Sequence, residues 1–239
     1  MASNSIEMLN PAKHSKLKVN TTRYNYVQNH VNATSVMVTE LSTIVHEYPI
    51  FITKNNSTGE FQLTAILGFS TGENLYLKDD TWQANYLPLD ILRRPFQLVS
   101  SDNSNTSEGH IAIDTANEQL QETTGEMLFD FSGKPTAYLQ RIQQTFSQLL
   151  KGSEQTRNIL KKADELGLIE PVTINIELND KESTSLNGLY SFNQKALTEL
   201  KGNALKEAHN ASVLQVCHLL LSSGAHLEKL IKWKNSQNI

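Results

Sequence analysis

The sequence has little cysteine and no long apolar run. Its 239 residues include one cysteine, Cys217, so an intramolecular disulfide and any multi-cysteine zinc or iron–sulfur site are excluded. Cys217 lies in the longest apolar run, Val213–Leu221, which falls well short of the ~20 residues that a membrane-spanning helix needs. The first thirty residues also lack an apolar segment of signal-peptide length. We therefore expect a soluble, cytoplasmic protein with no direct insertion into a membrane.

An excess of positive charge is also missing. The chain carries 21 Lys and Arg against 25 Asp and Glu, a formal net charge of -4, and it has no block of like charges. A nucleic-acid-binding domain usually presents a basic face. The charge pattern therefore argues against a nucleic-acid partner.

Recognisable catalytic, metal-binding and nucleotide-binding motifs are absent as well. The seven histidines show none of the spacings typical of metal sites, such as His-x-His or His-Glu-x-x-His. The chain has no Gly-x-x-x-x-Gly-Lys-Ser/Thr loop, no Gly-x-Gly-x-x-Gly turn and no Gly-x-Ser-x-Gly elbow. A Ser/His/Asp triad stays open, because its members need not be adjacent in sequence. We predict no catalytic residue, no metal and no cofactor, which favours a non-enzyme and leaves enzymatic activity an open question.

The chain does contain a β-rich first half. Two strand-like runs, Tyr48–Lys54 and Phe61–Leu67, flank a glycine-containing loop and predict an antiparallel hairpin. Pro49 has no N–H to donate, so we expect it to start its strand at a sheet edge or a bulge. The polar stretch Ser100–Gly109 is expected to be a loop. Further short strands are expected at residues 36–38, 74–77, 96–100 and 110–114.

Helical spacing of apolar residues begins after this half. It runs over residues 136–166 and predicts one long helix, either straight or bent at Gly152. Gly167 is suited to the position after the helix, and Pro171 enforces the stop.

The rest of the chain predicts a second hairpin and a second long helix. Val172–Leu178 alternates apolar and polar residues, and Ser183–Phe192 is its expected partner strand, with the turn at 179–182. A short helix is expected at 193–200 and a long one at 204–233. These elements predict an α+β fold whose two long helices and C-terminal hairpin pack against the β-rich half. We expect an N-terminal arm at residues 1–33, not necessarily ordered throughout, and a single domain at 34–239.

The polar residues most suggestive of binding lie near the first hairpin. Arg93 and Arg94 stand between apolar and aromatic residues and could grip a carboxylate or phosphate. With His46, Tyr48 and Tyr86 they form the predicted ligand-binding set. The alternative is that the arginines pair with local acids such as Asp90 and cover apolar surface with their stems.

The same region resembles the bacterial SapC family. The resemblance begins with His46–Phe51, Phe61–Phe69 and Gly72–Tyr76. It continues in order through Trp82, Tyr86–Pro88, Arg93–Phe96, Ile111–Asp114, Gly125–Asp130, Tyr138–Arg141, Leu166–Pro171, Leu186–Phe192 and His218–Ser222. Each motif is weak alone, but their joint order is specific and spans nearly the whole chain. Pro95 departs from the family pattern, which usually has an aromatic there.

The resemblance implies partners rather than chemistry. The family takes its name from a relative associated with bacterial surface-layer proteins. Other members are encoded near halogenase-like enzymes, cupin-like oxygenases and outer-membrane nutrient receptors, so a protein or peptide partner from such a system is implied. The family offers no established catalytic residues to carry over. The peptide-transport permease label belongs to an unrelated membrane protein and does not suit a chain without an apolar span.

We therefore expect a non-enzymatic accessory protein that binds a peptide or protein substrate for a bacterial surface or peptide-modification system. The alternative is a peptide-modifying enzyme or small-ligand-binding protein with a pocket near Arg93 and Arg94. A structural subunit that folds only in an oligomer is a third reading, and the sequence leaves the oligomeric state open.

Overall fold

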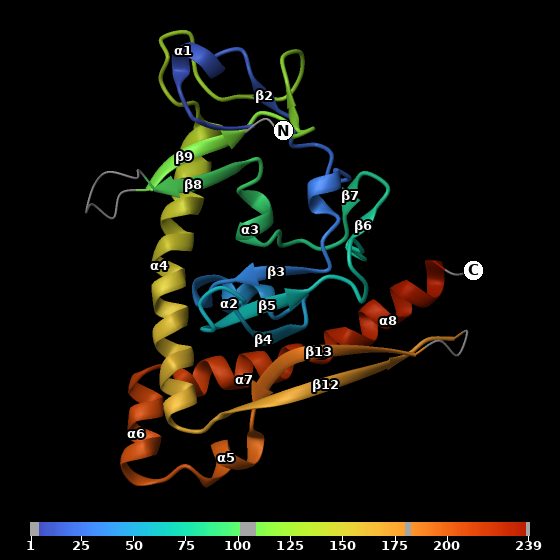
Figure 1. The fold of residues 1–239 in the computed structure, drawn as a ribbon, viewed down its shortest axis with the longest axis vertical. Helices are drawn as coiled ribbons and strands as arrows, with labels where there is room; N and C mark the ends of the chain where they lie inside the picture. The colour runs from blue at the N-terminus through green and yellow to red at the C-terminus, as the bar shows by residue number, and fades with distance from the viewer. Residues whose placement is uncertain (1–4, 101–108, 180–182, 238–239) are drawn as a thin grey trace. The chain divides into compact units, whose positions relative to one another are not determined.

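The computed structural model describes residues 5–100, 109–179 and 183–237, and these form an α+β fold (Figure 1). Most of the predicted loop at Ser100–Gly109 and of the predicted turn at 179–182 lies outside these residues. The chain divides into two compact units. Unit 1 comprises Met1–His30, Leu77–Gln83 and Leu89–Leu149, and unit 2 comprises Val31–Tyr76, Ala84–Pro88 and Leu150–Ile239.

Unit 1 is built from short antiparallel strands. One sheet has the order β1 (Ile6–Met8), β9 (Gly109–Asp114), β8 (Phe96–Ser100), and a second has the order β10 (Leu120–Gln121), β2 (Lys18–Val19), β11 (Glu126–Met127). Unit 1 also contains β6 (Leu77–Lys78) paired with β7 (Thr81–Trp82). Its helices are the short α1 (Pro11–His14), η1 (Val27–Asn29) and α3 (Leu89–Leu92), together with the part of α4 (Ala137–Glu165) up to Leu149. The strands predicted at 96–100 and 110–114 are confirmed. The expected arm, residues 1–33, carries β1, α1, β2 and η1, and the expected single domain contributes to both units.

Unit 2 contains a five-stranded antiparallel sheet. Its order is β12 (Ile169–Glu177), β13 (Ser183–Phe192), β4 (Ile50–Lys54), β5 (Phe61–Ile66), β3 (Ala33–Val36). Both predicted hairpins are confirmed, since β4 pairs with β5 and β12 pairs with β13. The expectation for Pro49 was wrong: β4 is the central strand, and Pro49 immediately precedes it. Its carbonyl still accepts a hydrogen bond from the backbone N–H of Ile66 at 3.0 Å.

The observed helices match the predicted ones in the middle of the chain and differ from them near its C-terminus. A single helix, α4 (Ala137–Glu165), and the short α5 (Gln194–Glu199) are as predicted, but the helix expected at 204–233 is three: α6 (Gly202–Asn210), α7 (Val213–Ser223) and α8 (His226–Gln237). Ser212 has φ 60°, a left-handed conformation that interrupts a right-handed helix. Residues 36–38, expected as strand, instead end β3 and begin α2 (Val38–Ile44).

Pro171 also has a different place from the expected one. It lies inside β12, which is an edge strand of the sheet, rather than at the stop of α4. A proline is tolerated at an edge because its missing N–H can face away from the paired strand. The helix ends instead at Glu165, and Gly167 adopts φ 67° just beyond it, as expected for a residue after a helix.

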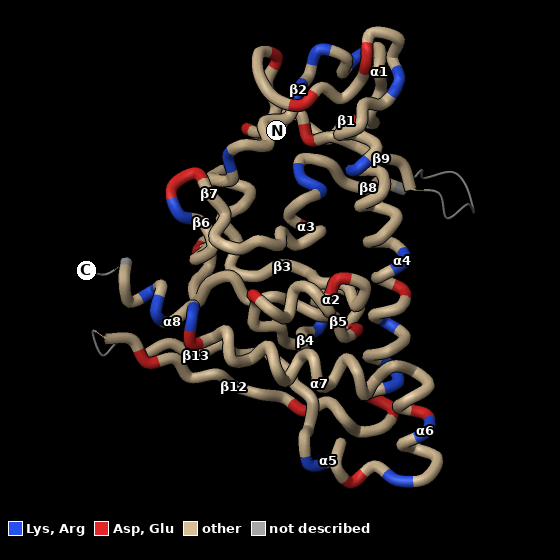
Figure 2. The backbone as a smooth tube through the Cα atoms, turned by 180° about the vertical axis from the view of Figure 1, so that it is seen from behind, with Lys and Arg blue, Asp and Glu red and all other residues tan. Residues whose placement is uncertain are grey.

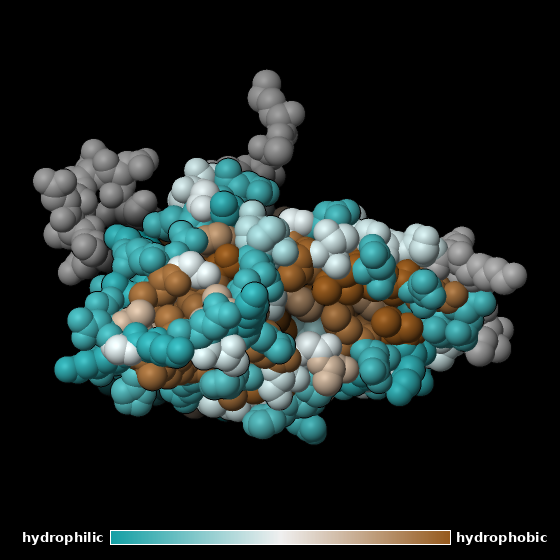
Figure 3. Space-filling model, turned by 90° about the horizontal axis from the view of Figure 1, so that it is seen from below, coloured by the Kyte–Doolittle hydropathy of each residue, from teal (hydrophilic) through white to brown (hydrophobic). Residues whose placement is uncertain are grey.

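The core of unit 2 combines the central strands with α7. Side chains of Ile50, Ile52 and Leu63 are buried, as are Val216 and Leu220 of α7. Along β12 the half-buried Val172 and Ile174 and the buried Ile176 alternate with the exposed Thr173 and Asn175. The face of the molecule seen from below shows apolar side chains gathered between hydrophilic ones (Figure 3). Charges of both signs are scattered over the described backbone (Figure 2). In the described ranges, no helix has the length and apolarity that crossing a bilayer requires.

Candidate functional site

The candidate site of unit 2 depends on a close contact between α2 and α4. The Thr156 hydroxyl donates to the Gly152 carbonyl at 2.7 Å and accepts from the backbone N–H of Val38 at 2.9 Å. Gly152 makes this approach possible, because a Cβ there would lie 2.7 Å from Cβ of Met37 and from Oγ1 of Thr39. The first turn of α2 is therefore fixed on one side of α4.

A groove runs beside this contact. Its volume is about 410 Å³, within the ~300–1,000 Å³ range of ligand pockets. Its walls come from α2, from one side of α4, and from the junction of α6 with α7. The lining consists of Val38, Thr39, Leu41, Ser42, Gln155, Asn158, Ile159, Asn210, Ala211, Ser212, Gln215, Val216 and Leu219.

The groove is lined by uncharged groups alone. Val38, Leu41, Val216 and other aliphatic side chains supply an apolar surface. The polar lining is made of hydroxyls and of four exposed side-chain amides, Gln155, Asn158, Asn210 and Gln215. These amides make no side-chain hydrogen bond to the other described residues, so each offers a donor and an acceptor to a ligand. The arrangement suits a neutral ligand with its own amide groups.

The break between α6 and α7 shapes one end of the groove. The backbone N–H groups of Ala211 and Ser212 close α6 by donating to the carbonyls of Glu207 and His209, both at 3.0 Å. The Ser212 carbonyl then accepts from the N–H of Val216 at 3.2 Å and starts α7. The left-handed conformation of Ser212 therefore turns the chain where the two helices meet the groove, which a continuous helix would not do.

Two predicted ligand-binding residues, Tyr48 and Tyr86, are brought together, and both serve an internal network. The buried Tyr48 hydroxyl donates to the Tyr86 carbonyl at 2.6 Å. The Tyr86 hydroxyl donates to the buried Glu40 carboxylate at 3.0 Å, and the N–H of Met37 donates to the same carboxylate at 3.0 Å. Burial, reinforced by Glu40, raises the pKa of Tyr86. This network positions the start of α2, and a ligand-binding role for either tyrosine stays a prediction.

The third predicted residue of unit 2, His46, lies exposed just beyond α2. Its neighbour Glu47 caps another segment, because the Glu47 carboxylate accepts from the backbone N–H groups of Asn85 and Tyr86 at 2.8 to 3.1 Å. The Tyr76 hydroxyl and the Lys229 ammonium both donate to the Glu47 carbonyl. The structure therefore places His46 beside a well-connected turn, while a ligand contact by its own ring stays a prediction.

Arg93 and Arg94 belong to unit 1, where both are engaged locally. Arg93 contacts Asp90 through Nε at 2.8 Å and Nη2 at 2.6 Å, and its Nη1 donates to the Phe96 carbonyl at 2.9 Å. Arg94 donates to the Gln28 carbonyl and to Oδ1 of Asn29. Burial lowers the pKa of Arg94, against the opposing effect of Asp90. Local pairing is what the alternative interpretation expects, and binding of a ligand by these arginines stays a prediction.

The lone cysteine is buried in unit 2. Cys217 lies within α7 at 0% exposure, and burial raises the pKa of its thiol to about 12. Because the thiolate is the reactive form, a raised pKa and an inaccessible sulfur both suppress its chemistry. Among the described residues, no three His, Cys, Asp or Glu side chains gather as a metal-holding group.

We expect the Cys217 thiol to resist labelling by a disulfide reagent such as DTNB at pH 8 in the native protein. In denaturant the same reagent should modify one thiol per chain at the rate of a free cysteine. The absorbance of the released thiolate measures both rates. Rapid labelling of the native protein would contradict the buried position of the sulfur.

Comparison with known protein families identifies the family of this α+β chain. The SapC family model matches residues 9–230. The chain therefore belongs to the SapC family, as the order of its motifs predicted. No match is found among curated proteins, and none among solved structures.

The groove is made of residues that the sequence did not single out. Gln155 and Asn158 of α4 form no motif with Asn210 and Gln215, which come from another helix pair. The available signal was a set of uncharged polar residues scattered along the three helices. That signal identifies a polar surface, but it does not indicate that these surfaces face one another.

Proposed function

We propose that this SapC protein is a non-enzymatic accessory protein that holds an uncharged peptide segment in the groove between α2, α4 and α7. The observation that carries the proposal is the lining, which joins four available side-chain amides to an aliphatic surface and contains no charged residue. A charged ligand would lose hydration there without gaining a partner of opposite charge.

Peptide groups match this lining because each carries an N–H donor and a C=O acceptor, and a side-chain amide offers both kinds of group in return. Gln155 and Asn158 on α4 and Gln215 on α7 can pair with the backbone of a bound segment, while Val38, Ile159 and Leu219 contact its aliphatic side chains. The volume of about 410 Å³ limits the bound part to a few residues. The proposed ligand is therefore a short, neutral, partly aliphatic stretch of a longer peptide or protein.

A displayed peptide library tests the proposal. Random peptides selected on the immobilised protein should be enriched in sequences with aliphatic and uncharged polar residues. The selected peptide, made synthetically and fluorescently labelled, should then bind in solution, as measured by fluorescence anisotropy. Asn158→Asp places a carboxylate in the groove at nearly constant volume, and we expect it to weaken that peptide at least about tenfold, through desolvation of the charge.

The matched control is Gln143→Glu, the same type of change at an exposed position of α4 outside the groove lining. This variant should bind the peptide like the unmodified protein. The proposal fails if the library yields no binding peptide. It also fails if the selected peptide binds the Asn158→Asp and unmodified proteins equally well.

A further inference from the structure

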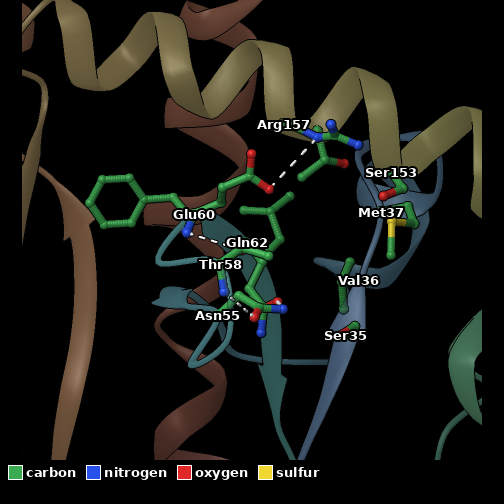
Figure 4. Close-up of a pocket in the computed structure, with 12 residues that line it drawn as sticks. Ser35, Val36, Met37, Asn55, Thr58, Glu60, Gln62, Ser153 and Arg157 are labelled. Atoms are coloured by element: carbon green, nitrogen blue, oxygen red, sulfur yellow. Dashed lines mark hydrogen bonds and ion pairs between the residues drawn. The ribbon is translucent and has the colours of Figure 1, made fainter.

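A second pocket lies in unit 2 beside the contact between α2 and α4, with Met37 and Thr156 in its lining. It is lined by the end of β3, by the β4–β5 loop with the start of β5, and by Ser153, Thr156 and Arg157 of α4 (Figure 4). Its volume is about 150 Å³, below the ~300–1,000 Å³ typical of sites for drug-sized ligands. A ligand enclosed here must therefore be small.

The pocket differs from the groove in carrying one charge of each sign. Arg157 projects from α4 and Glu60 from the β4–β5 loop, and Nε of Arg157 lies 3.9 Å from Oε2 of Glu60. This separation exceeds hydrogen-bond length, so neither group satisfies the other. Both side chains are 53% exposed, and neither forms another side-chain hydrogen bond or ion pair with the described residues. The guanidinium donors and carboxylate acceptors therefore remain open to a ligand.

We propose that this pocket binds a free α-amino acid with a small side chain. The ligand carboxylate takes the fork of Arg157 donors, which suits bidentate binding of a planar carboxylate. The ligand ammonium pairs with the neighbouring Glu60 carboxylate, which lies 3.9 Å from the Arg157 guanidinium. In an α-amino acid the ammonium and the carboxylate are attached to the same carbon. Their short separation suits the guanidinium of Arg157 and the carboxylate of Glu60, which are also close to each other.

The pairing of charges selects a zwitterion over a simple ion. A lone anion would be attracted by Arg157 and repelled by Glu60 at similar distance, and a lone cation would meet the reverse. The remaining lining supports a small polar ligand, because Ser35 and Ser153 present hydroxyls beside the apolar Val36 and Met37. This inference is independent of the proposed peptide site, since the two cavities share no lining residue.

Isothermal titration calorimetry with glycine, L-alanine and L-serine tests the proposal. At least one of the three should bind at low ionic strength, while acetate and methylammonium, which each supply one charge, should not. Arg157→Gln and Glu60→Gln should each weaken that amino acid at least about tenfold, because each removes one charge-assisted contact. Arg157→Lys, which keeps the charge and loses the fork, should weaken it less than Arg157→Gln.

The matched control is Lys161→Gln, which makes the same change of charge one turn further along α4 and outside the lining. Its binding should equal that of the unmodified protein. All altered residues are largely exposed, so circular dichroism should show an unchanged fold. The proposal is overturned if none of the three amino acids binds at concentrations up to about 10 mM, where even millimolar affinity is detectable. Acetate binding as tightly as the amino acids, or an unaffected Glu60→Gln variant, would overturn it as well.

Discussion

Gly152→Ala is expected to destabilise unit 2 by about 1–3 kcal/mol, although alanine favours helices more than glycine does. The added Cβ would lie 2.7 Å from Cβ of Met37 and from Oγ1 of Thr39, and 3.1 Å from Cγ of Met37. The Met37 Cβ is attached directly to the backbone, so the clash cannot be relieved by rotating a side chain. Helix α2 must move away from α4, and the Thr156–Val38 hydrogen bond must lengthen or break.

Urea unfolding followed by the fluorescence of Trp233 measures the effect. A Trp82→Phe background removes the other tryptophan, so the signal then reports on unit 2. The matched control is Gly224→Ala, where φ is -56° and the nearest atom to the added Cβ is 3.5 Å away. That variant should be neutral or slightly stabilised. Equal stability of the Gly152→Ala and unmodified proteins would contradict the close contact between α2 and α4.

Local patterns in the sequence predicted the elements whose partners are close in the chain. The β4–β5 and β12–β13 hairpins follow from alternating residues on either side of a short turn, and α4 follows from its apolar repeat. The order of the sheet was not accessible in this way. Pairing of β13 with β4 brings Tyr190 opposite Ile52, although more than half of the chain separates them in sequence. No local sequence pattern predicts this pairing. For the same reason Pro49 was expected at a sheet edge or a bulge.

The C-terminal helices show a second limit of periodicity. The apolar stripe of α6 continues into α7 and α8, so spacing alone predicted one helix over 204–233. Ser212 breaks the helix with a left-handed backbone, a conformation that residues other than Gly, Asn and Asp rarely adopt. A serine therefore gives no signal in the sequence for such a break, which creates one end of the candidate groove.

The candidate groove was hidden from the sequence for a related reason. Its amides are supplied by α4 and by the α6–α7 junction, which meet only in the folded chain. The sequence pointed instead to Tyr48 and Tyr86, which the fold uses to hold the start of α2 beside that groove. A distinctive block of sequence can therefore contain residues that hold a binding site in position, rather than residues that line it.

Tyr48→Ala is expected to cost unit 2 about 3–5 kcal/mol, the range for truncating a fully buried aromatic ring. The Tyr48 side chain has 0% exposure, and its ring stacks on that of Tyr76 with centroids 4.4 Å apart. Truncation leaves a cavity beside Tyr76 and removes the donor to the Tyr86 carbonyl. Because Tyr76 also meets Trp233 edge-on at 5.2 Å, Trp233 fluorescence in the Trp82→Phe background should follow the loss directly.

Two variants separate the contributions to this effect. Tyr48→Phe keeps the ring and loses the hydrogen bond from the hydroxyl to the Tyr86 carbonyl, so it should cost about 1 kcal/mol. Leu205→Ala truncates an exposed apolar side chain of the same unit and should leave stability nearly unchanged. If Tyr48→Ala weakens peptide binding while the urea midpoint stays constant, Tyr48 contacts ligand and is not a structural residue. The expected order, a large loss for alanine and a small one for phenylalanine, would show that this tyrosine acts by supporting α2.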